Sequence, residues 1–198
     1  MKKLIVPMVA VCLAISSFAQ TQLDAGASPH LSFKGVPMTG TINEFASQMK
    51  KNGLSYVNTT NGIAVFKGEM AGYKNCYVGV SNTKQKDIVY KVAVKFPDCD
   101  TWAALASNYF TVKEILTKKY GAATACVEAF KTYTPENDGF KLTQVAIGEC
   151  TYYTTYHTEK GTIQLSIAND ISTGSYVRLV YFDKINSEKI KELVINDL

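Results

Sequence analysis

The order of a helix followed by several short strands occurs twice along this chain, and this repeat limits the folds that the chain can adopt. The first copy begins with an amphipathic stripe after Thr41, and the second begins with a longer stripe after Thr101. Segments with alternating apolar and polar residues follow each stripe, a pattern typical of strands with one buried face. One copy alone would be a single sheet covered by one helix, so two copies must share a core. We therefore expect an α+β fold: two tandem helix-plus-antiparallel-meander units sharing one open sheet, with helices on one face and a C-terminal helix.

The first unit is expected over residues 20–97. Thr41 and Glu44 have the spacing of a capping box, in which the hydroxyl and the carboxylate each bind a free backbone N–H. Asn52-Gly53 is a typical left-handed stop, so a helix of about ten residues is predicted between these signals. Strands are predicted over 30–34, 63–70, 76–81 and 87–96.

The second unit is expected over residues 98–198 and forms one compact domain with the first. Gly121 ends its helix after two lysines, which suit the negative end of the helix dipole. The helix carries the clearest stripe of the chain, made of Trp102, Leu105, Tyr109, Val112, Leu116 and Tyr120. Strands are predicted over 124–133, 142–157, 162–168 and 176–183, the first two joined as a hairpin through the turn-prone residues 135–139. Asn186 or Ser187 is expected to cap a final helix with Ile190, Leu193, Val194 and Leu198 on one stripe.

The first nineteen residues have the pattern of a Sec-type signal peptide. A basic start is followed by the apolar run 4–14, and Ser17-Phe18-Ala19 places small residues at positions −3 and −1 of a cleavage site. The apolar run is too short to span a bilayer and contains Pro7, and no later segment is apolar enough to do so. We expect a periplasmic or secreted protein with no integral membrane segment after signal removal.

The cysteines beyond this segment are Cys76, Cys99, Cys126 and Cys150. An even number of cysteines in an oxidising compartment is typical of disulfides. Folding the predicted hairpin about Asp138 places Cys126 opposite Cys150, which predicts that pair and leaves Cys76 to pair with Cys99. The alternative is buried free thiols, since cysteine is often a small core residue. The absence of a C-x-x-C motif gives no support to a redox motif or a zinc knuckle.

The sequence gives little support to catalysis. His30 and His157 are the only histidines, and neither lies in a motif that supplies a nucleophile or a partner group. Asp98 and Asp100 form a carboxylate pair at the start of a helix, where acids suit the positive end of the dipole. The sequence contains no phosphate-binding loop and no calcium loop. We therefore expect a non-catalytic protein without a cofactor or a metal.

The alternation leaves one sheet face polar and rich in tyrosine. A three-residue loop of Glu159-Lys160-Gly161, with the glycine in the left-handed position, would put Tyr153 on the core face. The register of the strand over 151–157 stays open, because a shift of one residue exchanges the faces. Tyrosine and arginine are enriched at binding hot spots, although tyrosine is also a good strand former that tolerates water. The candidate partner-binding residues on the outer face are Tyr77, Tyr152, Tyr156, Gln164, Tyr176 and Arg178.

Two resemblances bear on this architecture. The tandem helix-plus-four-strand pattern resembles the fold of the beta-lactamase inhibitor protein, which implies a concave sheet. The chain also resembles small exported proteins of unknown function from Bacteroidetes-type bacteria, on SFAQ at the cleavage site, the HLSFKGVPMTGT opening, the TWAAL…KKYG helix and the DKIN…NDL end. This second resemblance covers nearly the whole mature chain and implies no particular activity.

Together these patterns predict an exported, non-catalytic binding module. Without Lys2 and Lys3 the formal charge falls from +4 to +2, which leaves no electrostatic footprint for nucleic acid. We expect a monomer whose tyrosine-rich sheet face binds a protein or a glycan. The alternatives are a cell-envelope assembly protein, an enzyme inhibitor and, with less support, a secreted hydrolase.

Overall fold

The computed structural model describes residues 28–82 and 87–196. The helices are α1 (Ile42–Lys51), α2 (Trp102–Tyr120), α3 (Asp138–Ala146) and α4 (Lys184–Asn196). The strands are β1 (Ser32–Phe33), β2 (Val36–Pro37), β3 (Ser55–Thr60), β4 (Ile63–Met70), β5 (Tyr73–Asn82), β6 (Val89–Lys95), β7 (Ala125–Phe130), β8 (Cys150–Thr158), β9 (Gly161–Asp170) and β10 (Gly174–Asp183). The predicted signal peptide over 1–19 lies outside the described residues.

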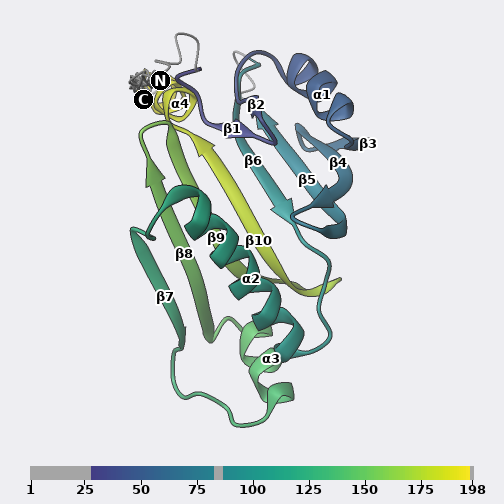
Figure 1. Ribbon diagram of the computed structural model, residues 1–198, viewed down its shortest axis with the longest axis vertical. Helices are drawn as coiled ribbons and strands as arrows, with labels where there is room; N and C mark the ends of the chain where they lie inside the picture. The colour runs from purple at the N-terminus through teal and green to yellow at the C-terminus, as the bar shows by residue number, and fades with distance from the viewer. Residues whose placement is uncertain (1–27, 83–86, 197–198) are drawn as a thin grey trace, which may run out of the picture.

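One antiparallel sheet joins both halves of the chain. In the described residues it has eight strands in the order β3-β4-β5-β6-β10-β9-β8-β7, and a separate hairpin pairs β1 with β2. The two units meet where β6 pairs with β10, for example with Val94 opposite Leu179. Figure 1 shows the resulting open sheet, in which the strands of the first unit lie on one side of this junction and those of the second unit on the other. The α+β fold with tandem units and a shared open sheet is confirmed.

Helices α1 and α2 pack on the same face of the sheet. One cross-strand row of directly paired residues runs through Tyr56, Phe66, Val78, Val94, Leu179, Leu165 and Thr154. The α1 residue Lys50 lies over the ring of Tyr56 at one end of this row, 5.3 Å from its centroid. The α2 residue Tyr109 hydrogen-bonds Thr154 at the other end, with 2.6 Å between the hydroxyls. Because a row of paired residues points to one side of a sheet, both helices cover that side.

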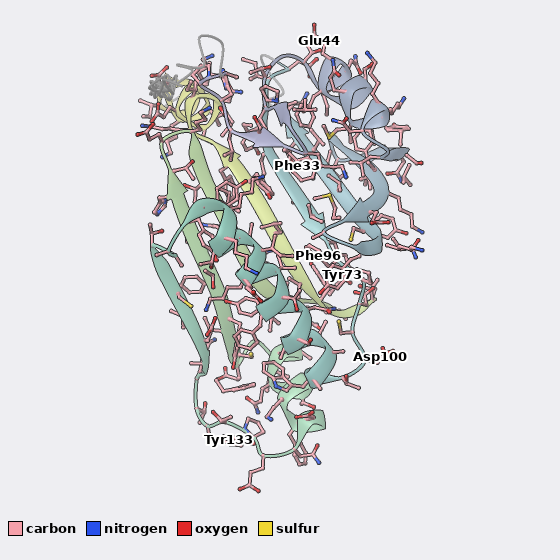
Figure 2. All side chains as sticks on the ribbon, viewed as in Figure 1. Phe33, Glu44, Tyr73, Phe96, Asp100 and Tyr133 are labelled. Carbon is pink, nitrogen blue, oxygen red and sulfur yellow. The ribbon has the colours of Figure 1, made fainter. Side chains whose placement is uncertain are left out.

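The core lies between this face and the helices. The β1–β2 hairpin contributes Phe33, which meets the ring of Tyr181 edge to face at 5.3 Å. In the first unit Tyr73 and Phe96 meet in the same way at 5.3 Å, and Figure 2 labels both. The hairpin therefore adds Phe33 to the core beside β10, one of the two strands at which the units meet.

A buried carboxylate ties the start of the described chain to its end. Asp183 accepts hydrogen bonds from the backbone N–H groups of Leu31 and Asn186, each at 2.8 Å, and its Oδ1 lies 3.0 Å from Nδ1 of His30. The Asn186 amide donates to the carbonyls of Met38 and Val89, each at 2.8 Å. Asp183 thus caps the N-terminus of α4. The predicted cap at Asn186 or Ser187 is therefore wrong, because it lies about one helical turn too late in the sequence. Leu198 of the predicted stripe lies outside the described residues.

Two elements differ from the sequence-based prediction. Residues 142–146 of the strand predicted over 142–157 belong to α3, which begins where the Asn137 side chain accepts a hydrogen bond from the Gly139 N–H at 2.7 Å. The turn-prone residues 135–139 therefore start a helix and do not close a hairpin. The fourth strand of the first unit, β3, was not predicted, because it is an exposed edge strand with no apolar alternation.

The β8–β9 hairpin is one residue out of the predicted register. Thr158 pairs with Gly161, so the loop has only two residues, and Tyr156 lies opposite Ile163. Gly161 does not supply a left-handed turn. A Cβ at this position would collide with the carbonyl oxygen of Phe182 on β10, so the glycine is required for close approach of two strands. The shift moves Tyr156 to the core face and Tyr153 to the opposite face.

The four cysteines of the described chain are free thiols, so neither predicted disulfide is present. Cys126 lies opposite Thr154, whereas Cys150 lies opposite Phe130. The two cysteines are thus four residues apart along the ladder, about 13 Å, and a disulfide needs Cα atoms within about 7 Å. The pairing of Cys126 with Cys150 fails because α3 occupies the segment assigned to the hairpin. The thiol of Cys76 donates to the Tyr73 carbonyl at 3.3 Å, and that of Cys99 donates to the Pro97 carbonyl at 3.7 Å.

Candidate functional site

The candidate site is the sheet face opposite α1 and α2, which we call the open face. We define it by three cross-strand rows of paired residues on β4, β5, β6, β10, β9 and β8. The rows are Lys67-Tyr77-Lys95-Arg178-Ser166-Tyr153, Val65-Gly79-Ala93-Val180-Gln164-Thr155 and Ile63-Ser81-Lys91-Phe182-Thr162-His157. The open face therefore crosses the β6–β10 junction and uses strands from both units.

Three of the six predicted binding residues lie on this face, and a fourth lies beside it. Tyr77 is 43% exposed, and Arg178 and Gln164 are also exposed. Tyr176 lies beside the open face, opposite Ala168 and two residues before Arg178 on β10, and is half-buried. Alternation alone placed these four side chains correctly because their strands contain no register ambiguity.

Tyr152 and Tyr156 do not lie on this face, so their assignment is wrong. Tyr156 is 1% exposed, and its hydroxyl donates to the carbonyl of Lys113 at 3.1 Å beneath α2. Tyr152 packs against Trp102 and Tyr109, with ring centroids 5.3 and 5.6 Å apart. These tyrosines hold α2 on the sheet.

Three other residues of β8 occupy the open face in their place. Tyr153, which is 38% exposed, Thr155 and His157 belong to the open face. Tyr153 and Arg178 line a hollow of about 160 Å³ near its centre, together with Thr155, Gln164, Leu165, Ser166 and Val180. The correct β8 register would have indicated these residues, since each follows by alternation.

The open face carries cations and no acid. Its three rows contain Lys67, Lys91, Lys95 and Arg178, and no aspartate or glutamate occurs among these paired residues. Lys95 pairs with Asp98 beyond the end of the sheet, with 2.9 Å between Nζ and Oδ1. Lys67, Lys91 and Arg178 form no ion pair within the described part of the chain. The face is therefore electropositive.

Lysine and aromatic side chains alternate across the face. Lys67 lies over the ring of Tyr77 at 5.5 Å from the centroid, and Lys95 lies over that of Tyr176 at 4.5 Å. Such contacts hold the ammonium groups at the surface while leaving their charge available to a partner. Tyr153 has no cation or ring partner among the described residues, so its ring is free for contact.

The two histidines of the described chain make different contacts. His157 Nδ1 lies 3.0 Å from the hydroxyl of Thr162, and His30 contacts the buried Asp183. Neither imidazole bonds a serine or cysteine side chain within residues 28–82 and 87–196. In the same residues no group of three histidine, cysteine or acidic side chains could hold a metal ion. No helix of the described chain is long and apolar enough to cross a membrane.

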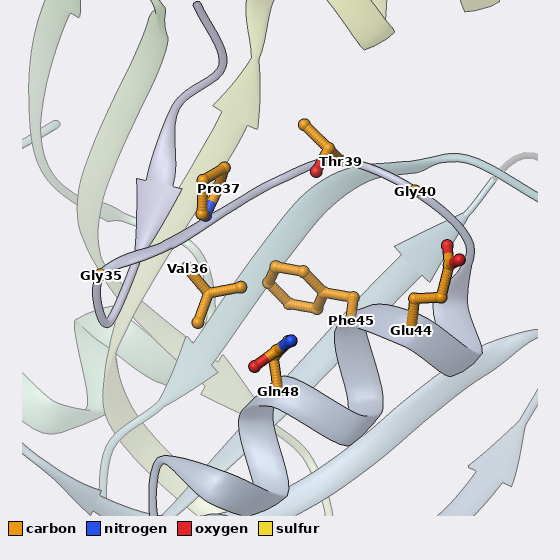
Figure 3. Close-up of a pocket in the computed structure, with 8 residues that line it drawn as sticks. All are labelled: Gly35, Val36, Pro37, Thr39, Gly40, Glu44, Phe45 and Gln48. Carbon is orange, nitrogen blue, oxygen red and sulfur yellow. The ribbon is translucent and has the colours of Figure 1, made fainter. Parts of the chain in front are cut away.

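A hollow of about 600 Å³ lies between the β1–β2 hairpin and α1 (Figure 3). Val36 and Phe45 line it with apolar groups. The Glu44 carboxylate accepts hydrogen bonds from the backbone and the hydroxyl of Thr41, at 2.8 and 3.0 Å. These bonds lower the pKa of Glu44. Since this carboxylate caps the helix, it is not available as a free acid or base in the hollow.

Comparisons with protein-family models, with curated proteins and with solved structures found no match to this chain. The function is therefore inferred from the geometry and charge of the open face.

Proposed function

We propose that the protein is an exported, non-catalytic binding module whose open face binds an acidic surface of another protein. The observation that carries this proposal is a sheet face that displays unpaired cations and aromatic side chains with no carboxylate among them. Complementary charge steers partners together and sets their register. Export is proposed on the pattern of residues 1–19.

The lining of the face favours a protein over a glycan. Glycans are bound largely by open aromatic ring faces, but lysine ammonium groups lie over the rings of Tyr77 and Tyr176. The hollow between Tyr153 and Arg178 is small and could take an inserted side chain. Tyrosine and arginine are among the residue types enriched at the hot spots of protein interfaces, which cluster around such pockets. A protein of this kind would be an enzyme inhibitor if its partner is an enzyme, and an envelope-assembly protein if its partner is a component of the cell envelope.

Charge reversal on the open face tests the proposal. The mature chain is immobilised and exposed to periplasmic extract and culture fluid, beside a Lys67→Glu, Arg178→Glu variant. A matched control carries Lys51→Glu and Lys118→Glu, which change the net charge equally but lie on α1 and α2. We expect the wild type and the control to retain an acidic protein. The open-face variant should bind that protein about tenfold or more weakly.

Two results would count against the proposal. Equal retention by both variants would show that the partner does not use this face. Retention of a polysaccharide without protein would replace the proposed partner by a glycan. If the partner is a protein, its identity separates the two forms of this function: an enzyme indicates an inhibitor, and an envelope component indicates an assembly protein.

A further inference from the structure

The small hollow of the open face has an exposed rim and a buried floor. Its volume is about 160 Å³, below the range of about 300–1,000 Å³ usual for sites that hold a whole small molecule. Tyr153, Gln164 and Arg178 line it with exposed side chains. Thr155 and Val180 also line it and are only 7% and 6% exposed, so they close its floor. A hollow of this size has room for one side-chain group of a partner.

The guanidinium group of Arg178 is a charge without a partner. It forms no ion pair and no hydrogen bond with any residue that the structure describes. Lys95 lies directly opposite it across the β6–β10 pair, where like charges repel each other. Because Lys95 is paired with Asp98, with 2.9 Å between Nζ and Oδ1, the uncompensated charge is that of Arg178. An anion bound at Arg178 would supply the missing partner.

Three neutral polar groups around the hollow are also free to bind. The Gln164 amide and the hydroxyls of Ser166 and Thr155 form no hydrogen bond within residues 28–82 and 87–196. Ser166 lies directly opposite Arg178 on β9, so both side chains leave the sheet on the same face. An amide N–H and a hydroxyl can each donate a hydrogen bond to an anion.

These groups favour a carboxylate over other side chains. A cationic group would be repelled by Arg178 and by the unpaired lysines of the open face. An apolar group would take the guanidinium out of water without giving it a partner, which costs free energy. A neutral amide adds no charge attraction. A carboxylate accepts two parallel hydrogen bonds from a guanidinium group and balances its charge.

On the basis of the proposed function, we propose that the hollow binds the carboxylate of an aspartate or glutamate side chain through Arg178. Gln164 and Ser166 lie beside Arg178 in the lining and can donate further hydrogen bonds to the same group. A side chain is favoured over a chain end, because the proposed partner is an acidic protein surface and the acids of such a surface are side chains.

Nuclear magnetic resonance titration of the ¹⁵N-labelled mature protein tests this assignment. The probes are acetyl-Gly-Glu-Gly-amide, its uncharged counterpart acetyl-Gly-Gln-Gly-amide, and acetyl-Gly-Gly-Gly, in which the carboxylate is terminal. We expect the glutamate peptide to give saturable shifts of the backbone amide signals of Gln164 and Ser166 and of the Nε–H signal of Arg178. The glutamine peptide should give no saturable shift.

Arg178→Gln should bind the glutamate peptide about tenfold more weakly, because it loses the hydrogen bonds to a charged group. Its side chain is exposed, so the fold should be kept. Gln164→Ala is a second variant of the hollow and should also weaken binding. Lys91→Gln removes the same charge from the open face outside the hollow, and should weaken binding by no more than about twofold in about 0.15 M salt, which screens distant charges. Lys51→Gln, on α1, is the matched control and should bind as the wild type does.

The assignment is overturned if the glutamate peptide gives no saturable shift, or if the glutamine peptide or acetyl-Gly-Gly-Gly binds as tightly. Equal weakening by Arg178→Gln and Lys91→Gln would also overturn it. The face would then attract acids by its overall charge alone, and the proposed function would stand. Failure of the proposed function is a separate result, because it is seen when the wild type retains no acidic protein in the capture experiment.

Discussion

Tyr153 and Tyr156 lie three residues apart on β8 and have opposite roles. The ring of Tyr156 is enclosed beneath α2, where its hydroxyl also lies 2.9 Å from that of Thr117. Tyr153 lies on the other face, where it lines the small hollow together with Arg178 from β10. Adjacent residues of a strand alternate sides, so the odd spacing separates the two tyrosines.

The first prediction concerns this pair. Tyr156→Ala should lower the free energy of unfolding by about 3–5 kcal/mol, as expected for a buried aromatic residue. Tyr153→Ala should change it by no more than about 0.5 kcal/mol, since its ring is at the surface. Urea unfolding followed by circular dichroism measures both. The reverse order would restore the register predicted from the sequence.

The second prediction concerns the thiols. Burial raises the pKa of Cys76 and of Cys150 to about 11, which keeps both protonated and poorly nucleophilic at neutral pH. Cys126 is exposed on the edge strand β7. In a time course with iodoacetamide, peptide mass spectrometry should find Cys126 modified first and Cys76 modified only after unfolding. Failure of all four to react in denaturant without a reductant would indicate disulfides.

At the scale of elements, α2 holds the second unit together. The Thr101 hydroxyl accepts a hydrogen bond from the Ala104 N–H at 3.2 Å and so caps the helix. Its buried residues are Trp102, Leu105, Tyr109, Val112 and Leu116. This stripe agrees with the sequence-based prediction, because a long helix repeats its apolar period over several turns.

The third prediction follows from that packing. Leu105→Ala should destabilise the protein by about 2–5 kcal/mol, because it opens a cavity under the helix. Ile115→Ala removes a residue of similar size from the exposed side of α2 and should cost less than about 1 kcal/mol. Thermal and urea unfolding of the two variants give the comparison. Equal destabilisation would mean that the helix is turned differently on the sheet.

Short elements were harder to predict for a physical reason. The residues Asn137-Asp138-Gly139 suit either a turn or a helix start, and tertiary packing against α2 decides between them. Gly161 suits either a left-handed loop or a close approach of strands, and only the position of Phe182 on β10 shows that the second applies. Both ambiguities are resolved by residues far away in sequence.

At the scale of the whole molecule, the Asp183–Asn186 junction connects the N-terminal hairpin, β6 and α4. The Asn186 amide is the shared donor to the carbonyls of Met38 and Val89. No local pattern around Asn186 indicates these partners, which lie far from it in the chain. The sequence therefore predicted the helix but not the network that anchors it.

The fourth prediction tests this junction. Asn186→Ala leaves two buried carbonyl groups without their donor and should cost about 2 kcal/mol or more. The exposed Asn58→Ala on β3 should be close to neutral. Hydrogen exchange should show faster opening of the β1–β2 hairpin in the Asn186 variant. Unchanged exchange there would mean that the hairpin is held by its apolar contacts alone.

The shared open sheet was predictable from the tandem pattern, and half of the open face was predictable from alternation. The other half depended on the register of β8, which exchanges Tyr152 and Tyr156 for Tyr153 and His157. The cationic character of the face could not be read from the sequence, because it depends on the pairing of β6 with β10. That pairing places Lys95 opposite Arg178 and joins the rows of the two units.

Lysine acetylation of the captured complex, read by mass spectrometry, tests the open face most directly. Lys67 and Lys91 should be protected in the complex and reactive in the free protein, because a partner covers their face. Lys51 and Lys118, on α1 and α2, should react equally in both states. Protection of Lys51 and Lys118 with continued reaction of Lys67 and Lys91 would contradict the account and would place the partner on the helical face.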